Sequence, residues 1–368
     1  MRKYLFALLF FIFLPSSALA FKIGSSFTDP CHEWITLFAF FRDGEQTIVP
    51  PDAFANYEAD ESQVWLQIAE YLEKELNHTF DNDVDRFLAI SLIIGVRYPD
   101  QEGYALSDLS NLRDVHMASE GQEEHALRAP EHDHENGDQE SIAQMKQFIL
   151  SQVDVAYDAF QRSRSEDSRI NKQDIKAQSI TVDFWLEHYG IIKVPVWEPL
   201  FAMGKAVHAL QDSFAHTYRS DDTFQIYAVG NFIEAFEPEY KEAIDGPRHS
   251  NHIDSCNNTD VHPLRDSAVV ATRELFLAMK VYFAVLPTQE TERIQARQHV
   301  EDVLETWLSY QNGCGFSQNY CDSKWVPIAK KEETQPLFGC MTSSHKNCFS
   351  LLFLSFALLC QRRRLYPL

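Results

Sequence analysis

Apolar residues recur at helical spacing through most of the chain, and this pattern predicts a bundle of helices. Residues 60–77 carry apolar side chains in helical register, and residues 84–96 form a more continuously apolar stretch that is typical of a buried helix. No strand pattern competes strongly in the middle of the chain. The expected fold is therefore all-α, a multi-helix bundle. Further helices are expected at residues 34–41, 141–162, 172–189, 264–286 and 289–310.

Several polar or irregular stretches interrupt these helices. A residue that precedes proline disfavours helical backbone, so the Tyr98-Pro99 step is expected to end a helix and to leave Asp100 just beyond it. Residues 107–138 are polar and rich in histidine, which is typical of a loop region. Residues 224–236 are apolar but ambiguous, and either a helix or an extended segment is compatible with them.

The N-terminus has the pattern of a secretory signal peptide. A basic start, Met1-Arg2-Lys3, precedes an apolar run over residues 4–14 and the small-residue sequence Ala18-Leu19-Ala20. We expect residues 1–20 to be removed, so that the mature chain begins at Phe21 and acts outside the cytoplasm. A buried helix is the alternative interpretation of the apolar run.

The C-terminus is expected to be a separate module. Residues 330–340 are a polar linker, and residues 341–368 hold an apolar run, Phe349–Leu359, followed by Arg362–Arg364. The apolar run is shorter than the roughly 17–25 residues of a full membrane span. This arrangement resembles the C-terminal sorting tags of bacterial envelope proteins, which implies a membrane tether and a tag-processing protease as a partner. A buried terminal helix is the alternative.

Composition adds two constraints. The formal net charge of −22 argues against broad nucleic-acid binding, which normally needs a basic surface. Seven cysteines in an exported chain make disulfides plausible. Cys314 and Cys321 are close enough to bridge a loop, and Cys31 and Cys256 each adjoin a candidate site segment that a disulfide between them would join.

The strongest chemical signal is a ladder of three side chains, His208, Asp212 and His216, at intervals of four residues. On an α-helix such residues share one face. The two histidines would be about 12 Å apart along the axis, too far for one ion with ligand bonds of about 2 Å. The ladder therefore predicts a site of two or more zinc-type ions, with Asp212 as the shared carboxylate. A polar stripe satisfied by hydrogen bonds is the alternative.

The segment Gly204–His216 resembles the central motif of the superfamily of bacterial zinc-dependent phospholipases C and fungal single-strand nucleases. The resemblance implies an all-α fold and a three-zinc cluster. The spacing differs from that of the phospholipases, because the second histidine follows Asp212 by four residues rather than six.

The resemblance also suggests ligands elsewhere in the chain. His32 is the expected N-terminal ligand, although a helix cap is the other interpretation of this residue. One aspartate and one histidine are expected from the middle of the chain, and two ligands from the region after residue 246. The candidates are Asp100 with His125 or His116, and then His252 with Asp254, with His249 as the second choice and His262 as a rival.

For three other polar residues, a position at the surface is considered beside a role at the site. His132 and His134 lie in a charged stretch and are expected at the surface. Arg219 follows the ladder closely and is a candidate for binding an anionic phosphate, or a simple surface residue.

The sequence thus predicts an exported zinc-dependent phosphodiester hydrolase, most simply phospholipase C-like, with two or three zinc ions. The ions would polarise the phosphate and lower the pKa of a bound water, and Asp100 or Asp212 would orient that water. The expected substrate is a phospholipid or another phosphodiester, reached at a membrane surface, and no stable nucleic-acid partner is expected. A single-strand nuclease of the same fold and a non-catalytic, zinc-containing surface protein are the alternatives.

Overall fold

The computed structural model describes residues 30–42, 45–46, 48, 63–80, 82–105, 108–164, 179–186, 189–250 and 252–331. The chain divides into two compact units, Met1–Ala329 and Lys330–Leu368, and only Lys330 and Lys331 of the second unit are described. The expected signal peptide (1–20) and C-terminal tag (341–368) therefore lie outside the described residues.

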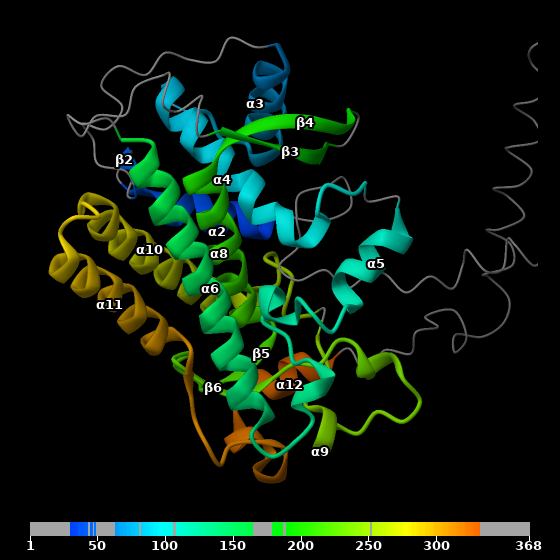
Figure 1. Cartoon of the computed structure of the whole chain (residues 1–368). Coiled ribbons are helices and arrows are strands. Elements are labelled where there is room, and N and C mark those ends of the chain that lie inside the picture. The colour runs from blue at the N-terminus through cyan, green and yellow to red at the C-terminus, as the bar shows by residue number, and fades with distance from the viewer. Residues whose placement is uncertain are drawn as a thin grey trace, which may run out of the picture. The chain divides into compact units, whose positions relative to one another are not determined.

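Helices make up most of the described part of the first unit, as the sequence predicts, but small sheets accompany them (Figure 1). The helices are α2 (Cys31–Phe40), α3 (Gln63–Leu76), α4 (Asp83–Gln101), α5 (Leu109–Met117), α6 (Gly137–Arg162), α8 (Glu198–Ala215), α9 (Glu242–Asp245), α10 (His262–Ala284), α11 (Glu290–Trp307) and α12 (Trp325–Ala329). The strands are β1 (Phe41–Arg42), β2 (Glu45–Gln46), β3 (Ser179–Leu186), β4 (Gly190–Trp197), β5 (Thr217–Arg219), β6 (Gln225–Val229) and β7 (Ser309–Tyr310). Short 3₁₀ helices include η3 (Gln122–His125) and η4 (Pro130–His132).

Helix α8 is the element around which the others pack. It contacts α4, α6, α10 and α2, and Figure 1 shows it running through the middle of the helical layer. Its sequence is apolar on nearly every side, which is typical of a helix enclosed by neighbours. Pro199 lies in the first turn, where its missing N–H removes no helical hydrogen bond. The ligand ladder therefore lies in the interior of the unit.

Two glycines allow α4 and α8 to cross at very short range. A Cβ atom added to Gly204 of α8 would lie 2.6 Å from the Cα atom of Gly95, and one added to Gly95 would lie 2.2 Å from the backbone oxygen of Phe201. Backbone atoms cannot move aside as a flexible side chain can. The crossing therefore needs glycine on both helices, and it brings the end of α4 next to the ladder on α8.

The expected helix end at Pro99 is wrong. Helix α4 continues through Pro99 to Gln101, so Asp100 lies in the last turn of the helix rather than in a loop. Pro99 has no N–H to donate to the carbonyl of Gly95, four residues earlier. The turn still closes, because the Glu102 N–H donates to the carbonyl of Tyr98 at 2.7 Å. Packing against α8 thus outweighs the local preference of the residue before proline.

The expected helix over residues 172–189 is also wrong. Residues 179–186 form β3, which pairs in antiparallel register with β4 over its whole length, from Ser179 opposite Trp197 to Leu186 opposite Gly190. Along β3 the buried side chains Val182, Phe184 and Leu186 alternate with more exposed ones. This period of two is the signature of a half-buried strand, and its β-branched and aromatic residues favour extended backbone. The ambiguous stretch 224–236 also contains a strand, β6.

Both cysteine pairings expected from the sequence are confirmed. The structure joins Cys31 to Cys256 and Cys314 to Cys321. The first disulfide links the start of α2 to a segment 225 residues later in the chain. Disulfides persist in oxidising compartments, so the pairings indicate an extracellular or equivalent environment.

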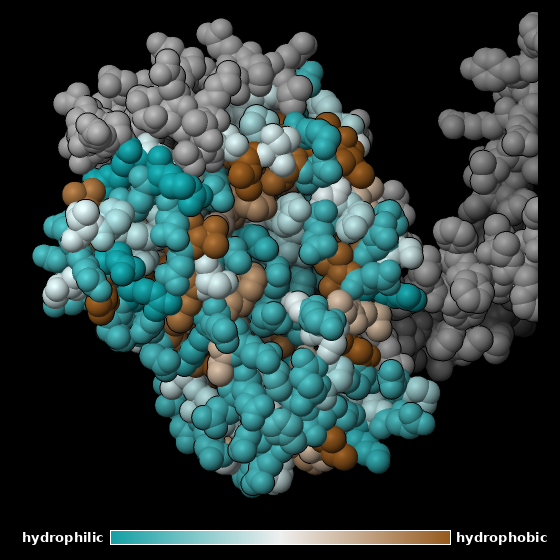
Figure 2. Space-filling view, in the orientation of Figure 1, coloured by the Kyte–Doolittle hydropathy of each residue, from teal (hydrophilic) through white to brown (hydrophobic). Residues whose placement is uncertain are grey.

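Within the described ranges, no helix is both long enough and apolar enough to span a bilayer. The face shown in Figure 2 is mostly hydrophilic, and its apolar residues lie in small separate groups.

We expect Gly204→Ala to destabilise the first unit, because its new methyl group would meet the backbone of α4. Overpacking of this kind costs about 1–3 kcal/mol of unfolding free energy, measurable by urea titration. Gly315→Ala is the matched control, since Gly315 has a negative φ and no heavy atom within 4 Å of an added Cβ. Equal stability of the two variants would contradict the tight crossing.

Candidate metal centre

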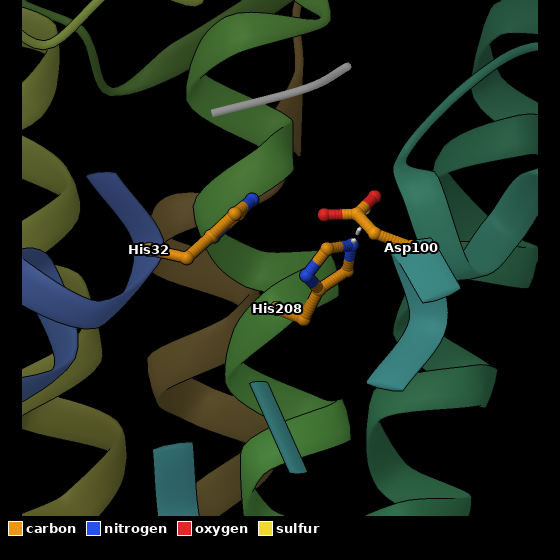
Figure 3. Close-up of side chains that lie close together, drawn as sticks. All are labelled: His32, Asp100 and His208. Atoms are coloured by element: carbon orange, nitrogen blue, oxygen red, sulfur yellow. Dashed lines mark ion pairs between the residues drawn. The ribbon is translucent and has the colours of Figure 1, made fainter. Parts of the chain in front are cut away.

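Six ligand-type side chains converge near the C-terminal end of α4 and the C-terminal half of α8. Figure 3 shows His32, Asp100 and His208 turned toward one another from α2, α4 and α8. All three are fully buried. The other members of this first cluster are His116, His125 and Asp212.

Asp212 lies at the middle of the first cluster. Its Oδ1 is 3.0 Å from His32 Nε2, and its Oδ2 is 3.1 Å from His208 Nε2 and 3.6 Å from His125 Nδ1. Each oxygen of one carboxylate thus faces a different set of imidazoles. This is the arrangement expected of a carboxylate that bridges two ions.

Asp100 forms a second focus in the same cluster. Its Oδ1 lies 3.4 Å from His116 Nε2, 3.5 Å from His125 Nδ1 and 3.7 Å from His208 Nε2. Ligand atoms bound to one tetrahedral zinc at about 2.0–2.1 Å are roughly 3.4 Å apart. Most hydrogen bonds are shorter than this, at about 2.7–3.2 Å. The separations around Asp100 therefore fit an ion better than direct hydrogen bonds.

His216 belongs to a second cluster, with His249 and Asp254. Its Nε2 lies 3.8 Å from Asp254 Oδ1, and His249 Nε2 lies 3.1 Å from Asp254 Oδ2. The Nδ1 of His216 donates to the backbone carbonyl of His125, so it is not available to an ion shared with Asp212. Among the ladder residues, Asp212 therefore pairs with His208, while His216 faces the other way.

Hydrogen bonds on the outer side of three histidines fix which ring nitrogen faces each cluster. His32 Nδ1 donates to Gln211 Oε1 at 2.7 Å, and His116 Nδ1 donates to the Leu112 carbonyl at 2.7 Å. His216 makes the equivalent bond to His125. In each case the remaining Nε2 points inward, and in the neutral ring it carries a lone pair. Metal-binding histidines almost always have such an outer partner.

Several inward-facing atoms have no hydrogen-bond partner within the described part of the chain. They include both carboxylate oxygens of Asp100 and the Nε2 atoms of His116 and His216. Burying polar atoms without a partner is costly, particularly when they are charged. A cation bound among them would remove that cost, so the donor set fits a metal. Among the described residues, the possible three-residue sites are His32/Asp100/His208, Asp100/His116/His125, His125/His208/Asp212 and His216/His249/Asp254.

The charges of the first cluster shift its pKa values strongly. Burial alone would raise the pKa of Asp212, but the histidines around it, His208 first, hold that pKa well below its usual range. Burial would lower the pKa of His32, but the Asp212 carboxylate outweighs it and raises that pKa to about 9. Burial lowers the pKa of His216 to about 4. An incoming metal must therefore displace a proton from His32 near neutral pH, but not from His216.

One disulfide and one buried ion pair hold α2 in position. The Cys31–Cys256 disulfide joins the residue before His32 to the segment that carries Asp254. On the other side of His32, Glu33 forms a buried ion pair with Arg97 of α4. Arg97 also contacts Glu75 Oε2 of α3 at 2.9 Å. The two clusters are thus connected through the backbone of α2.

The structure brings together most of the residues expected at the site, with one exchange. His249, the second choice, accompanies Asp254, whereas His252 belongs to neither cluster within the described residues; the carbonyl of His252 accepts a hydrogen bond from Asn258. The rival His262 begins α10, with Pro263 in the first turn, and joins neither cluster. Both His116 and His125, which the sequence left as alternatives, reach Asp100.

The expected surface position of His132 is wrong, because only 4% of its surface is exposed and its Nδ1 lies 3.1 Å from the Ser141 hydroxyl. His134 has a half-exposed side chain that pairs with Glu140, as a surface residue would.

The structure contradicts a phosphate-binding role for Arg219. Its side chain is fully buried, and its guanidinium donates to the carbonyls of Ser213, Thr223 and Trp307 and to the Ser213 hydroxyl. The same group lies 4.0 Å from the centre of the Phe214 ring. With its donors occupied by the protein, Arg219 joins β5 to the end of α8 and α11 instead of facing a substrate.

Sequence reasoning gave no role to Gln211. Its amide oxygen accepts from His32, and its Nε2 donates to Thr36 at 2.9 Å and to Thr272 at 3.4 Å. The available signal was a polar residue next to Asp212 on a helix that is otherwise apolar.

No protein-family model matches the chain, and no curated protein or solved structure is significantly similar to it. The function of this chain is therefore inferred from the geometry of the two clusters and from the local motif.

We expect Gln211→Leu to weaken metal binding at the first cluster about 10–100-fold, since His32 would lose the acceptor that orients its ring. The measurement is a competition titration with a chromophoric chelator. Gln298→Leu, on the exposed face of α11, is the matched control. Equal affinity in both variants would exclude a role for Gln211 in orienting His32.

Proposed function

We propose that this chain is an exported, zinc-dependent hydrolase of phosphodiesters, most simply a phospholipase C-like enzyme. The observation that carries the proposal is the convergence of nine histidine and aspartate side chains, eight of them buried and His249 partly so, into two neighbouring clusters, with the Asp212 carboxylate between His32 and His208. This convergence agrees with the three-zinc centre that the Gly204–His216 motif implies by resemblance.

Zinc is the metal that suits the donors best. Both clusters combine imidazole nitrogens with carboxylate oxygens and contain no thiolate, and zinc readily takes such mixed sets. We propose His32, Asp100, His125, His208 and Asp212 as ligands of the first cluster, and His216, His249 and Asp254 as ligands of the second. Zinc bound there would polarise a phosphoryl oxygen and lower the pKa of a water molecule.

The second cluster favours an enzyme over a purely structural zinc protein. It offers three ligating side chains among the described residues, whereas structural zinc sites are usually closed by four. A site with three protein ligands keeps a position for water or substrate. The non-catalytic alternative would be supported by a metal-loaded crystal structure in which protein atoms fill every coordination position.

In this proposal the chain's own residues hold and shield the reacting groups. Asp100 and Asp212 are fully buried, so the protein shields them from bulk water. Both carboxylates face imidazoles, which keeps them ionised. An oxygen of Asp100 or Asp212 that is not bound to metal would accept a hydrogen bond from the attacking water and orient it.

The substrate proposal follows from charge and from compartment. A formal net charge of −22 disfavours association with polyanionic nucleic acid, and the two disulfides fit an exported protein. A phospholipid at a membrane surface is therefore the first choice, and a single-strand nuclease of the same fold is the second. We further propose that residues 1–20 direct export and that residues 341–368 tether the chain to the envelope until a protease removes them.

We expect the purified mature protein to contain at least two equivalents of zinc. His208→Ala and Asp212→Ala should each lose metal and reduce phosphodiesterase activity by at least about 10²-fold, because both remove a ligand of the first cluster. His262→Ala is the control, and it should retain both properties. The measurement is metal analysis by mass spectrometry alongside the assay; unchanged metal content in both ligand variants would end the zinc hypothesis.

We expect the enzyme to release a phosphorylated head group from lecithin, and a chelator to abolish this release. The reason is that the phosphate must be polarised by the bound metal. Parallel assays on lecithin vesicles and single-stranded DNA distinguish the two substrates. Cleavage of DNA without lipid turnover would replace the phospholipase proposal by the nuclease.

A further inference from the structure

Helix α5 (Leu109–Met117) has little apolar surface with which to pack. Among its residues whose burial is described, only Leu112 and His116 are buried, and the side chains between them point partly or fully to solvent. In Figure 1 this short helix lies beyond the end of α4, outside the main helical layer. Burial of one leucine contributes only about 1.5–3 kcal/mol. Besides Leu112, His116 is therefore the buried side chain of α5 that can hold this helix in place.

His116 presents a lone pair to the first cluster. Its Nδ1 donates to the Leu112 carbonyl at 2.7 Å, so a neutral ring has no proton on Nε2. That Nε2 lies 3.4 Å from Asp100 Oδ1 and has no hydrogen-bond partner in the described structure. The ring also stacks on His125, with centroids 4.9 Å apart, and His125 Nδ1 approaches the same carboxylate oxygen at 3.5 Å.

Three ligand-type atoms, Asp100 Oδ1, His116 Nε2 and His125 Nδ1, thus lie close enough together to bind one cation. The distances match the roughly 3.4 Å expected between ligands of one tetrahedral zinc. We propose that a metal ion held by Asp100, His116 and His125 fastens α5 to the end of α4, so that metal loading positions this helix.

The position of α5 matters because it forms one wall of a pocket beside the metal centre. The pocket has a volume of about 600 Å³, and Asn111, Asp114 and Val115 of α5 line it on one side. Pro99 at the end of α4 and the ligand His125 line it as well. Through His116, metal binding would therefore shape the space next to the reacting groups. Gln122, which donates to the carbonyls of His116 and Ala118, holds only the C-terminal end of the helix.

This inference rests on the proposed metal centre but not on the identity of the substrate. The test is hydrogen–deuterium exchange of peptides that cover residues 109–117, with zinc and after removal of zinc by chelator. In the unaltered protein, zinc should slow exchange in α5 at least about tenfold. Peptides from α11, which holds no ligand, should change little and serve as an internal reference.

His116→Ala should bind less zinc than the unaltered protein and should leave α5 exchanging rapidly whether or not zinc is present. His134→Ala, which removes a half-exposed histidine that joins neither cluster, is the matched control. Leu112→Ala is a second variant that removes the apolar contact but keeps the ligand, so its α5 should still respond to zinc. Thermal unfolding of each variant shows whether the rest of the unit remains folded.

The outcomes separate this inference from the proposed function. Full zinc content and zinc-dependent protection of α5 in His116→Ala would overturn the inference and leave the hydrolase proposal standing. Absence of metal binding in the unaltered protein would overturn both. Zinc-dependent protection that is present in the unaltered protein and lost in His116→Ala would support the inference even if neither lecithin nor DNA is cleaved.

Discussion

The constraint on which the structure depends is the burial of two carboxylates among imidazoles. Asp100 and Asp212 are both fully buried, and their oxygens face histidine nitrogens rather than water. Removing an ionised group from water costs several kcal/mol unless an opposite charge compensates. Protonated histidines supply part of that charge in the metal-free chain, and bound cations would supply it better. The interior of this fold therefore contains clusters of residues that could hold a metal ion.

The surrounding structure serves to keep the donors at these positions. Gly95 and Gly204 allow the two central helices to approach closely enough for Asp100 to reach His208. The disulfide at Cys31 and the ion pair of Glu33 with Arg97 fix α2 on both sides of His32. Because ligand geometry must be accurate to a fraction of an ångström, rigid support of this kind is what a metal site requires.

The two clusters are chemically different, which has consequences for function. The first draws donors from α2, α4, α5, η3 and α8, and its histidines are strongly coupled to two carboxylates. The second has His216, His249 and Asp254, and burial keeps His216 neutral. A more completely surrounded cluster suits firm retention of metal, whereas a cluster with fewer protein ligands suits exchange of water and substrate. The proposed hydrolase would use both properties.

The sequence by itself determined the features that depend on local spacing. The interval of four between His208 and Asp212 places both on one face of α8 in any helical context, and the helices over α3, α6, α10 and α11 follow from their own periodicity. The pairing of Cys31 with Cys256 could be inferred because each adjoins a candidate ligand segment, and that of Cys314 with Cys321 because they are close in the sequence. Only the tertiary structure decided which distant residues meet. It places His249 rather than His252 beside Asp254, and both His116 and His125 beside Asp100. It also buries Arg219 completely. It also decided where the local preference of the sequence is overridden, since α4 continues through Pro99 and residues 179–186 form a strand. The physical reason is that these outcomes depend on packing between segments far apart in the chain, whose energy outweighs the preferences of single residues.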